Sequence, residues 1–279
     1  MDDCNVLIKS FSAFIFLLSM TQAFSHEFWL EPINYRVEVG KPIKVHEKVG
    51  QDFKGNKYVY LPSSYQFLKL TLDDKTVAVK SKLGDLPAVN EVVEGEGLMI
   101  LSAETTPLDV TYEKWEKFES FIKNKGLDWV LEKHKTRKLP KKNFVESYRR
   151  FAKTLVKLGH GKGNDRALGL GFEWVVETNP YTSKDTPIKA QLLWKGEPHP
   201  HAHVGVFNRY LNSDSKMGKS ELIKTELITD AEGRVEIPRA KGGQFLINAV
   251  QMIEAPEEMA KSKGAVWETH WASVTYALD

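Results

Sequence analysis

Three histidines alternate with other residues in one short segment, PHPHAH, at residues 198–203. If the segment is extended, side chains alternate between two faces, so His199, His201 and His203 lie on one face about 7 Å apart. Imidazole nitrogen is a suitable ligand for Ni²⁺, Cu²⁺ and Zn²⁺, so three rings on one face predict a transition-metal site. The alternative is a solvated, histidine-rich turn with only adventitious affinity for metals.

His26 is a second candidate ligand, because it follows a possible signal-peptide cleavage site after Ser25. Cleavage there would make His26 the first residue, and its α-amine and Nδ1 could then chelate one metal ion. One further imidazole, from His46, His270 or the 198–203 segment, would complete a T-shaped site of three nitrogens. Alternatively, His26 only begins the first strand.

The remaining histidines have less distinctive surroundings. His270 lies between Trp267 and Trp271, a context more typical of a packed histidine than of a ligand. His134 and His160 lie in basic or Gly-rich segments and are expected to be exposed. The predicted cofactor is a transition-metal ion (Ni, Co or Cu), with His26, His199, His201 and His203 as ligands and His46 and His270 as possible additional ligands.

The composition restricts the other atoms that could bind a metal. The chain has 279 residues and one cysteine, Cys4, which excludes an intramolecular disulfide, a zinc ribbon and a thiolate cluster. Lys and Arg total 39 and Asp and Glu total 37, so the formal net charge of +2 gives no sequence-wide attraction for nucleic acid. We therefore expect nitrogen and oxygen ligands and no nucleic-acid partner.

Residues 1–25 have the pattern of a secretory signal peptide. An apolar run over residues 6–20 is followed by small residues, and cleavage is expected after Ala23 or after Ser25. The core of the run, residues 11–20, is too short to span a bilayer, so we expect no stable membrane insertion after cleavage. The sequence predicts a periplasmic or secreted protein, with an uncleaved anchor as the alternative.

No sequence motif specifies an enzyme. The chain contains no Gly-x-Ser-x-Gly elbow, His-Glu-x-x-His helix, Walker loop or dinucleotide-binding fingerprint. We therefore expect a protein without catalytic activity. A metal-dependent oxidase that uses the N-terminal histidine is a minor alternative.

The hydrophobic pattern divides the chain after residue 25 into three stretches. Residues 26–112 and 172–279 contain short strand-like segments between Gly, Pro and Asn-Asp signals. Residues 113–171 instead have apolar side chains at helical spacing, in one stripe over 115–131 and a second over 144–156. The expected strands are 35–39, 42–49, 66–72, 76–80, 97–102, 173–178, 188–194, 203–209, 221–228, 234–238, 244–253 and 271–277.

These stretches predict a mainly β fold with two β-sandwich domains. We expect an N-terminal β-sandwich portion over 26–112 and a helical insertion with its linker over 113–171. Seven strand-like runs with hairpin spacing over 172–279 are typical of an immunoglobulin-like or prealbumin-like sandwich.

Several blocks of the chain resemble a known family. They are HEFWLEP at 26–32, KFESFIKNKGL at 117–127, ESYRRFAKTL at 146–155, TDAEGRV at 229–235 and WASVTY at 271–276. In this order they resemble the bacterial DUF4198 family, also described as NikM-like periplasmic components of cobalt and nickel transport. The resemblance implies a periplasmic or secreted protein with β-sandwich domains, associated with transition-metal uptake and possible contact with a membrane transporter component.

Two classes of function remain. The first is a periplasmic metal-binding protein that is accessory to nickel, cobalt or copper uptake or handling. The second is a non-enzymatic binding or adhesion module, whose loops or exposed tryptophans would contact a carbohydrate or a protein partner. The candidate tryptophans are Trp29, Trp194, Trp267 and Trp271.

Overall fold

The computed structural model describes residues 26–211, 220–239 and 242–279. The candidate signal peptide, residues 1–25, lies outside these described residues. The described chain is mainly β, which confirms this part of the predicted fold class. None of its helices is both long enough and apolar enough to cross a membrane.

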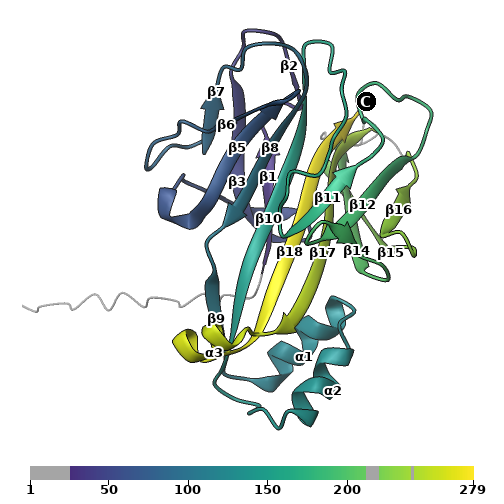
Figure 1. The fold of residues 1–279 in the computed structure, drawn as a ribbon. Coiled ribbons are helices and arrows are strands. Elements are labelled where there is room, and N and C mark those ends of the chain that lie inside the picture. The colour runs from purple at the N-terminus through teal and green to yellow at the C-terminus, as the bar shows by residue number, and fades with distance from the viewer. Residues whose placement is uncertain (1–25, 212–219, 240–241) are drawn as a thin grey trace, which may run out of the picture.

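A ten-stranded sheet runs through the centre of the molecule (Figure 1). Its main path follows the order β15, β14, β17, β18, β10, β8, β5 and β6, and β2 and β9 also pair with β10. The bounds are β2 Arg36–Val37, β5 Tyr65–Leu72, β6 Lys75–Ala78, β8 Gly97–Thr105, β9 Leu108–Tyr112, β10 Phe144–Leu158, β14 His203–Leu211, β15 Ser220–Ile228, β17 Gly243–Glu254 and β18 Ala265–Leu278.

The long strands β10 and β18 pair in parallel and join the two halves of the chain. Strands β5 to β9 come from the N-terminal half, whereas β14 to β18 come from the C-terminal half. The predicted division into two separate sandwiches is therefore not confirmed, because one sheet contains strands of both halves.

The helix predicted over 144–156 is wrong, because this segment is strand β10. Both faces of β10 are covered: Phe151 and Leu155 belong to one hydrophobic cluster, whereas Ala152 and Val156 belong to another. A strand that is buried on both faces has apolar residues at nearly every position, and such a run can also match helical spacing. The segment 113–171 is therefore only partly helical.

Two smaller sheets cover opposite faces of the central sheet. The first contains β1 Glu27–Pro32, β3 Ile43–Gln51, β4 Lys54–Tyr58 and β7 Val89–Glu91. The second contains β11 Phe172–Val176, β12 Ile188–Trp194, β13 Glu197–Pro198 and β16 Arg234–Ile237. Side chains of the first sheet share a cluster with Ala152 and Val156, and those of the second pack with Phe151 and Leu155.

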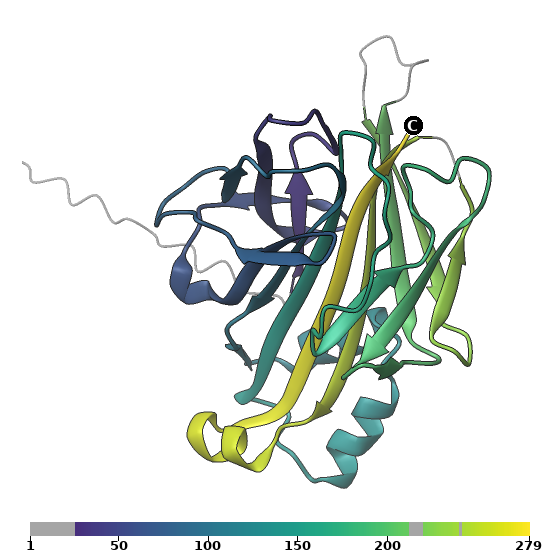
Figure 2. The same cartoon turned by 45° about the horizontal axis from the view of Figure 1, so that its top comes forward.

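The helices lie at one end of the central sheet, whereas β18 ends at the other (Figures 1 and 2). Helices α1 Trp115–Asn124 and α2 Trp129–Thr136 confirm the first predicted helical stripe. They bury Phe118 and Val130 in a cluster with Trp267 and Trp271 of β18. A 3-10 turn, η1 Pro62–Ser64, precedes β5, and α3 Glu257–Lys263 connects β17 to β18.

Candidate metal-binding site

The histidine-rich segment turns and does not form an extended strand. β13 ends at Pro198 and β14 begins at His203, while His201 has a left-handed φ of 57°. The buried Thr229 holds this turn: its hydroxyl donates to the carbonyl oxygen of His199 at 2.9 Å and accepts from the amide of Ala202 at 2.8 Å. The expectation of three rings on one strand face is therefore wrong.

The turn directs His199 and His203 to opposite faces of the central sheet. The ring of His199 lies 5.5 Å from Phe172, between the central sheet and the second small sheet. Burial lowers the pKa of His199, and a hydrogen bond with Gln251 partly offsets this effect. His203 instead packs on Gly126, where an added Cβ would lie 2.6 Å from its Cδ2. These two histidines cannot bind the same metal ion.

His203 lies in a group of polar residues around the start of β1. We call this group the β1-start cluster and define it as His26, Glu27, Lys125, His203 and Glu226. Glu27 is 3% exposed, and its Oε1 lies 3.3 Å from the ammonium of Lys125. The other carboxylate oxygen, Oε2, is buried without a hydrogen-bond partner.

Glu226 joins the β1-start cluster from the neighbouring strand β15. Its carboxylate lies 2.9 Å from the Lys224 ammonium, which lowers the pKa of Glu226 most. Electrostatic interactions with His203 and Lys125 lower this pKa further, so both residues lie close enough to act on the carboxylate. Glu226 is nevertheless exposed, in contrast to Glu27.

The packing of β1 against β14, which belong to different sheets, places the start of β1 near His203. Farther along these strands, Glu31 contacts Arg209, with a sequence offset of 178 residues. Trp29 and Phe207 have the same offset and share one hydrophobic cluster. The same offset relates His203 to position 25 of the sequence, directly before His26, so His203 lies near the start of β1. The side chain of His26 is half-buried.

His270 belongs to a second group, on the face that also carries His199. Its Nε2 lies 3.3 Å from Glu268, which also pairs with Arg149 at 3.2 Å. Burial raises the pKa of Glu268, but the contacts with His270 and Arg149 lower it by more, so the net shift is downward. The His270 ring lies 4.7 Å from that of Trp194, and its Nδ1 is buried without a hydrogen-bond partner.

His46 lies away from both groups. It faces Glu31 across the pairing of β3 with β1, and five residues of β1, roughly 16 Å, separate its partner from His26. Burial lowers the pKa of His46, and the neighbouring Lys57 lowers it further. His46 is thus not positioned to share a ligand with His26.

The exposure predicted for His134 is wrong, whereas that for His160 is confirmed. His134 is 1% exposed, accepts a hydrogen bond from Trp267 at Nδ1 and contacts the carbonyl oxygen of Pro140 through Nε2. Burial lowers the pKa of His134, so this histidine is a neutral core residue.

Within residues 26–211, 220–239 and 242–279, no group of three or more His, Cys, Asp or Glu side chains is arranged to hold a metal ion. A site in this part of the chain would need a donor other than these side chains. An α-amine at His26 would be such a donor, because it would add a second nitrogen from the same residue.

The comparisons with known proteins assign a family. The family model described as "Domain of unknown function (DUF4198)" matches residues 23–253. The chain belongs to the DUF4198 family. The match extends from the residues before β1 almost to the end of β17, and so includes the whole β1-start cluster. A search of the curated proteins gave no match.

Most tryptophans proposed for an adhesion surface lie inside this DUF4198 chain. Trp29, Trp267 and Trp271 are each at most 1% exposed, and only Trp194 is half-buried. The expectation that these four tryptophans form an exposed binding surface is therefore wrong. The exposed tryptophan is Trp129 of α2, which carried no prediction.

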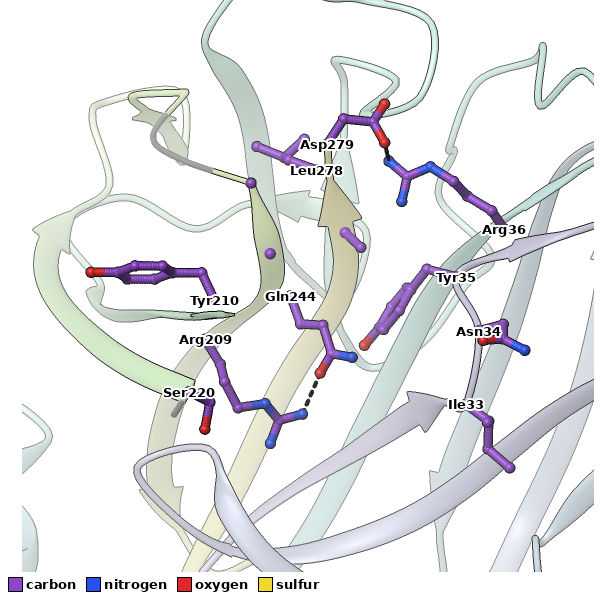
Figure 3. A pocket seen from close by; sticks show the side chains of 13 residues that line it. Ile33, Asn34, Tyr35, Arg36, Arg209, Tyr210, Ser220, Gln244, Leu278 and Asp279 are labelled. Carbon is purple, nitrogen blue, oxygen red and sulfur yellow. Dashed lines mark hydrogen bonds and ion pairs between the residues drawn. The ribbon is translucent and has the colours of Figure 1, made fainter. Parts of the chain in front are cut away.

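Sequence reasoning singled out neither Glu27 as a buried carboxylate nor a cavity at the far end of β1. This cavity has a volume of about 1030 Å³ and lies among β14, β17, β18 and the segment after β1 (Figure 3). Its lining residues come from five separate parts of the chain, so no local motif could indicate it. For Glu27, the sequence signal that could have indicated burial was its position between His26 and the aromatic residues Phe28 and Trp29, which are buried.

Proposed function

We propose that the mature protein binds a transition-metal ion at the β1-start cluster. The ligands would be the α-amine and imidazole of His26 and the imidazole of His203, and the nearby carboxylates of Glu27 and Glu226 would balance the charge of the ion. The observation that carries the proposal is the buried carboxylate of Glu27, whose Oε2 has no hydrogen-bond partner. A buried, unsatisfied carboxylate oxygen is costly, and a bound cation would offset this cost.

The proposed donor set needs only two histidines. The amine and ring of one N-terminal histidine supply two nitrogens, and His203 supplies a third. A set of three nitrogen donors suits Ni²⁺, Co²⁺ and Cu²⁺ better than Ca²⁺ or Mg²⁺, which prefer oxygen ligands. The reference pKa of an α-amine, about 7.7 to 8.0, allows a metal ion to displace its proton near neutral pH.

The local charges support a cation at this position. Glu27 pairs with Lys125 at 3.3 Å, and the same ammonium lies 4.9 Å from the centre of the Trp271 ring. Lys125 can therefore leave Glu27 and keep a favourable contact with the aromatic ring. If a divalent ion took the place of the Lys125 ammonium, the carboxylates of Glu27 and Glu226 would face two positive charges instead of one.

The same proposal includes a periplasmic or secreted location and a role in metal uptake or handling. It is supported by the signal-peptide pattern of residues 1–25 and by the resemblance to NikM-like transport components. A membrane transporter component is the proposed partner. N-terminal sequencing of the protein from its native compartment tests the location and the cleavage site, and a chain that begins at Met1 or at Phe24 would exclude the chelate at His26.

Calorimetric titration with Ni²⁺, Co²⁺ and Cu²⁺ tests the site directly. The reference is a protein that begins at His26, and the test variants are His203→Ala and an otherwise identical chain with one alanine added before His26. Each change removes one nitrogen donor, so we expect each to weaken binding at least about tenfold, or about 1.4 kcal/mol.

The matched controls are His199→Ala, on the opposite face of the sheet, and His46→Ala, on β3. Both should retain the affinity of the reference protein. Equal affinity for the reference, the extended chain and His203→Ala would refute the proposed site. An equal loss in His199→Ala would indicate a site in the histidine-rich turn instead.

A further inference from the structure

Strand β15 leaves one edge of the central sheet open. It is the last strand on the main path of the sheet and pairs only with β14. Among the residues that the structure describes, no other backbone hydrogen bond reaches positions 222–228. The strand contains no proline, so each of its outward N–H and C=O groups can pair with an added strand. This edge is therefore suited to strand addition.

The exposed side chains of β15 are both apolar and charged. Ile223 and Ile228 are 47% and 62% exposed. Lys224 and Glu226 lie on one face of the strand, and their charged groups are 2.9 Å apart. A lysine on an edge strand usually opposes the addition of another strand. A partner strand must therefore place a carboxylate opposite Lys224.

A second copy of this chain meets that condition in one register. Facing residues of a two-fold antiparallel pair have the same orientation, so the two-fold axis passes through a residue. With the axis at Thr225, Lys224 of each copy faces Glu226 of the other. With the axis at Lys224 or at Glu226, identical charges would face each other and would destabilise the pair. The charges therefore favour an axis at Thr225.

The same register covers the two exposed isoleucines. With the axis at Thr225, Ile223 of each copy faces Leu227 of the other, and Ile228 faces Leu222. Leu222 and Leu227 are half-buried, so each isoleucine meets an apolar side chain that is already partly covered. Apolar cross-strand pairs stabilise a sheet. The apolar and the charged side chains of β15 thus agree on one arrangement.

We propose that two copies of this chain associate through antiparallel pairing of their β15 strands, with the two-fold axis at Thr225. The central sheets of the two copies then form one continuous sheet. One pair of strands makes a small interface, so the dimer is weak and its population depends on protein concentration. The pairing needs no metal ion and is independent of the proposed metal site.

Sedimentation equilibrium tests this proposal on the protein that begins at His26. The protein is measured from micromolar to millimolar concentration, with a chelator in every sample, and we expect a monomer–dimer equilibrium. The variants Lys224→Glu and Glu226→Lys each place four like charges around the axis. Each should therefore weaken dimerisation at least about tenfold.

The matched control is Lys75→Glu, which makes the same charge change at an exposed position on β6, the last strand at the other end of the main path. It should retain the dimerisation constant of the unmodified protein. Thermal melts would verify that each variant is folded.

An equimolar mixture of the two single variants tests the register itself. In a heterodimer of Lys224→Glu with Glu226→Lys, each facing position again joins a carboxylate and an ammonium. We expect this heterodimer to regain the affinity of the unmodified dimer. The double variant Lys224→Glu/Glu226→Lys should regain it as well, because both of its facing pairs are again of opposite charge.

Four results would overturn the proposal. A monomer at every concentration would exclude a second copy as the partner of this edge. A dimer that neither single variant weakens would place the interface elsewhere. Failure of the mixture and of the double variant to regain affinity would exclude the axis at Thr225. A dimer that forms only without the chelator would assign the association to a bridging metal ion.

Discussion

Individual buried carboxylates have different roles in this molecule because their partners differ. Glu173 is paired with the buried ammonium of Lys153 at 3.2 Å and also accepts three backbone N–H groups. Glu27 has one cationic partner and one unsatisfied oxygen, whereas Glu146 has no cationic partner within reach among the described residues. Glu27 and Glu146 each have one buried oxygen without a hydrogen-bond partner, and Glu27 is the one that lies at the proposed metal site.

Glu146 should make stability depend on pH. It is fully buried and accepts from the Tyr112 hydroxyl at 2.8 Å, and burial raises its pKa from 4.5 to about 7. The folded state therefore holds a proton that the unfolded state releases at lower pH. Its contribution to stability is full below about pH 4.5 and is lost as the pH rises through about 7, a loss of about 3 kcal/mol.

Urea unfolding at intervals between pH 5 and pH 8 measures this effect. The variant Glu146→Gln, which cannot ionise, should show a flatter pH dependence than the unmodified protein over this range. Glu119→Gln, at an exposed position on α1, is the control and should leave the slope unchanged. The same slope in the unmodified protein and in Glu146→Gln would contradict the prediction.

Among the elements, the turn between β13 and β14 decides how the histidines are distributed. It combines a left-handed residue, His201, with a buried hydroxyl, Thr229, that bridges both ends of the turn. His199 therefore lies on one face of the central sheet and His203 on the other. The alternating spacing of these histidines predicted a row of ligands, but the turn at His201 separates His199 from His203.

Removal of the Thr229 hydroxyl should destabilise this turn. Thr229→Val has nearly the same shape but leaves the carbonyl of His199 and the amide of Ala202 without their partner. We expect a loss of about 2 to 3 kcal/mol in the free energy of unfolding, measured by urea titration. Thr225→Val, at an exposed position on β15, should change stability by less than about 0.5 kcal/mol. Equal stability of both variants would contradict the bridging role.

At the scale of the whole molecule, the parallel pair β10 and β18 joins strands of both halves into one sheet. Each of the two strands carries side chains of more than one hydrophobic cluster. Neither half can therefore lose its packing without exposing apolar surface of the other. The proposed metal site and the cavity lie at opposite ends of β1, which packs on this joint sheet.

This arrangement predicts one cooperative unfolding transition. Far-UV circular dichroism and tryptophan fluorescence should give the same midpoint in urea, within experimental error, because secondary structure and core packing are lost together. A first transition in which part of the strand signal disappears before the fluorescence changes would show that the halves unfold separately, as two independent sandwiches would.

The sequence by itself was sufficient to predict the local features of this protein. Gly and Pro signals correctly separated most strands, and apolar spacing identified α1 and α2, because both effects act over a few residues. The absence of cysteine after Cys4 limited any metal site in the chain from residue 26 onward to nitrogen and oxygen donors. The same reasoning identified His26 and His203 as candidates, and it gave the segment with His203 as one of several possible partners of His26 without selecting it.

Only the tertiary structure decided the features that depend on contacts between distant residues. β10 forms a strand because the central sheet and both small sheets bury its two faces, which no local spacing can reveal. The proximity of His203 to the start of β1 follows from the packing of β1 on β14, at an offset of 178 residues. Long-range packing thus selects which histidines meet, and local sequence determines only which residues are available.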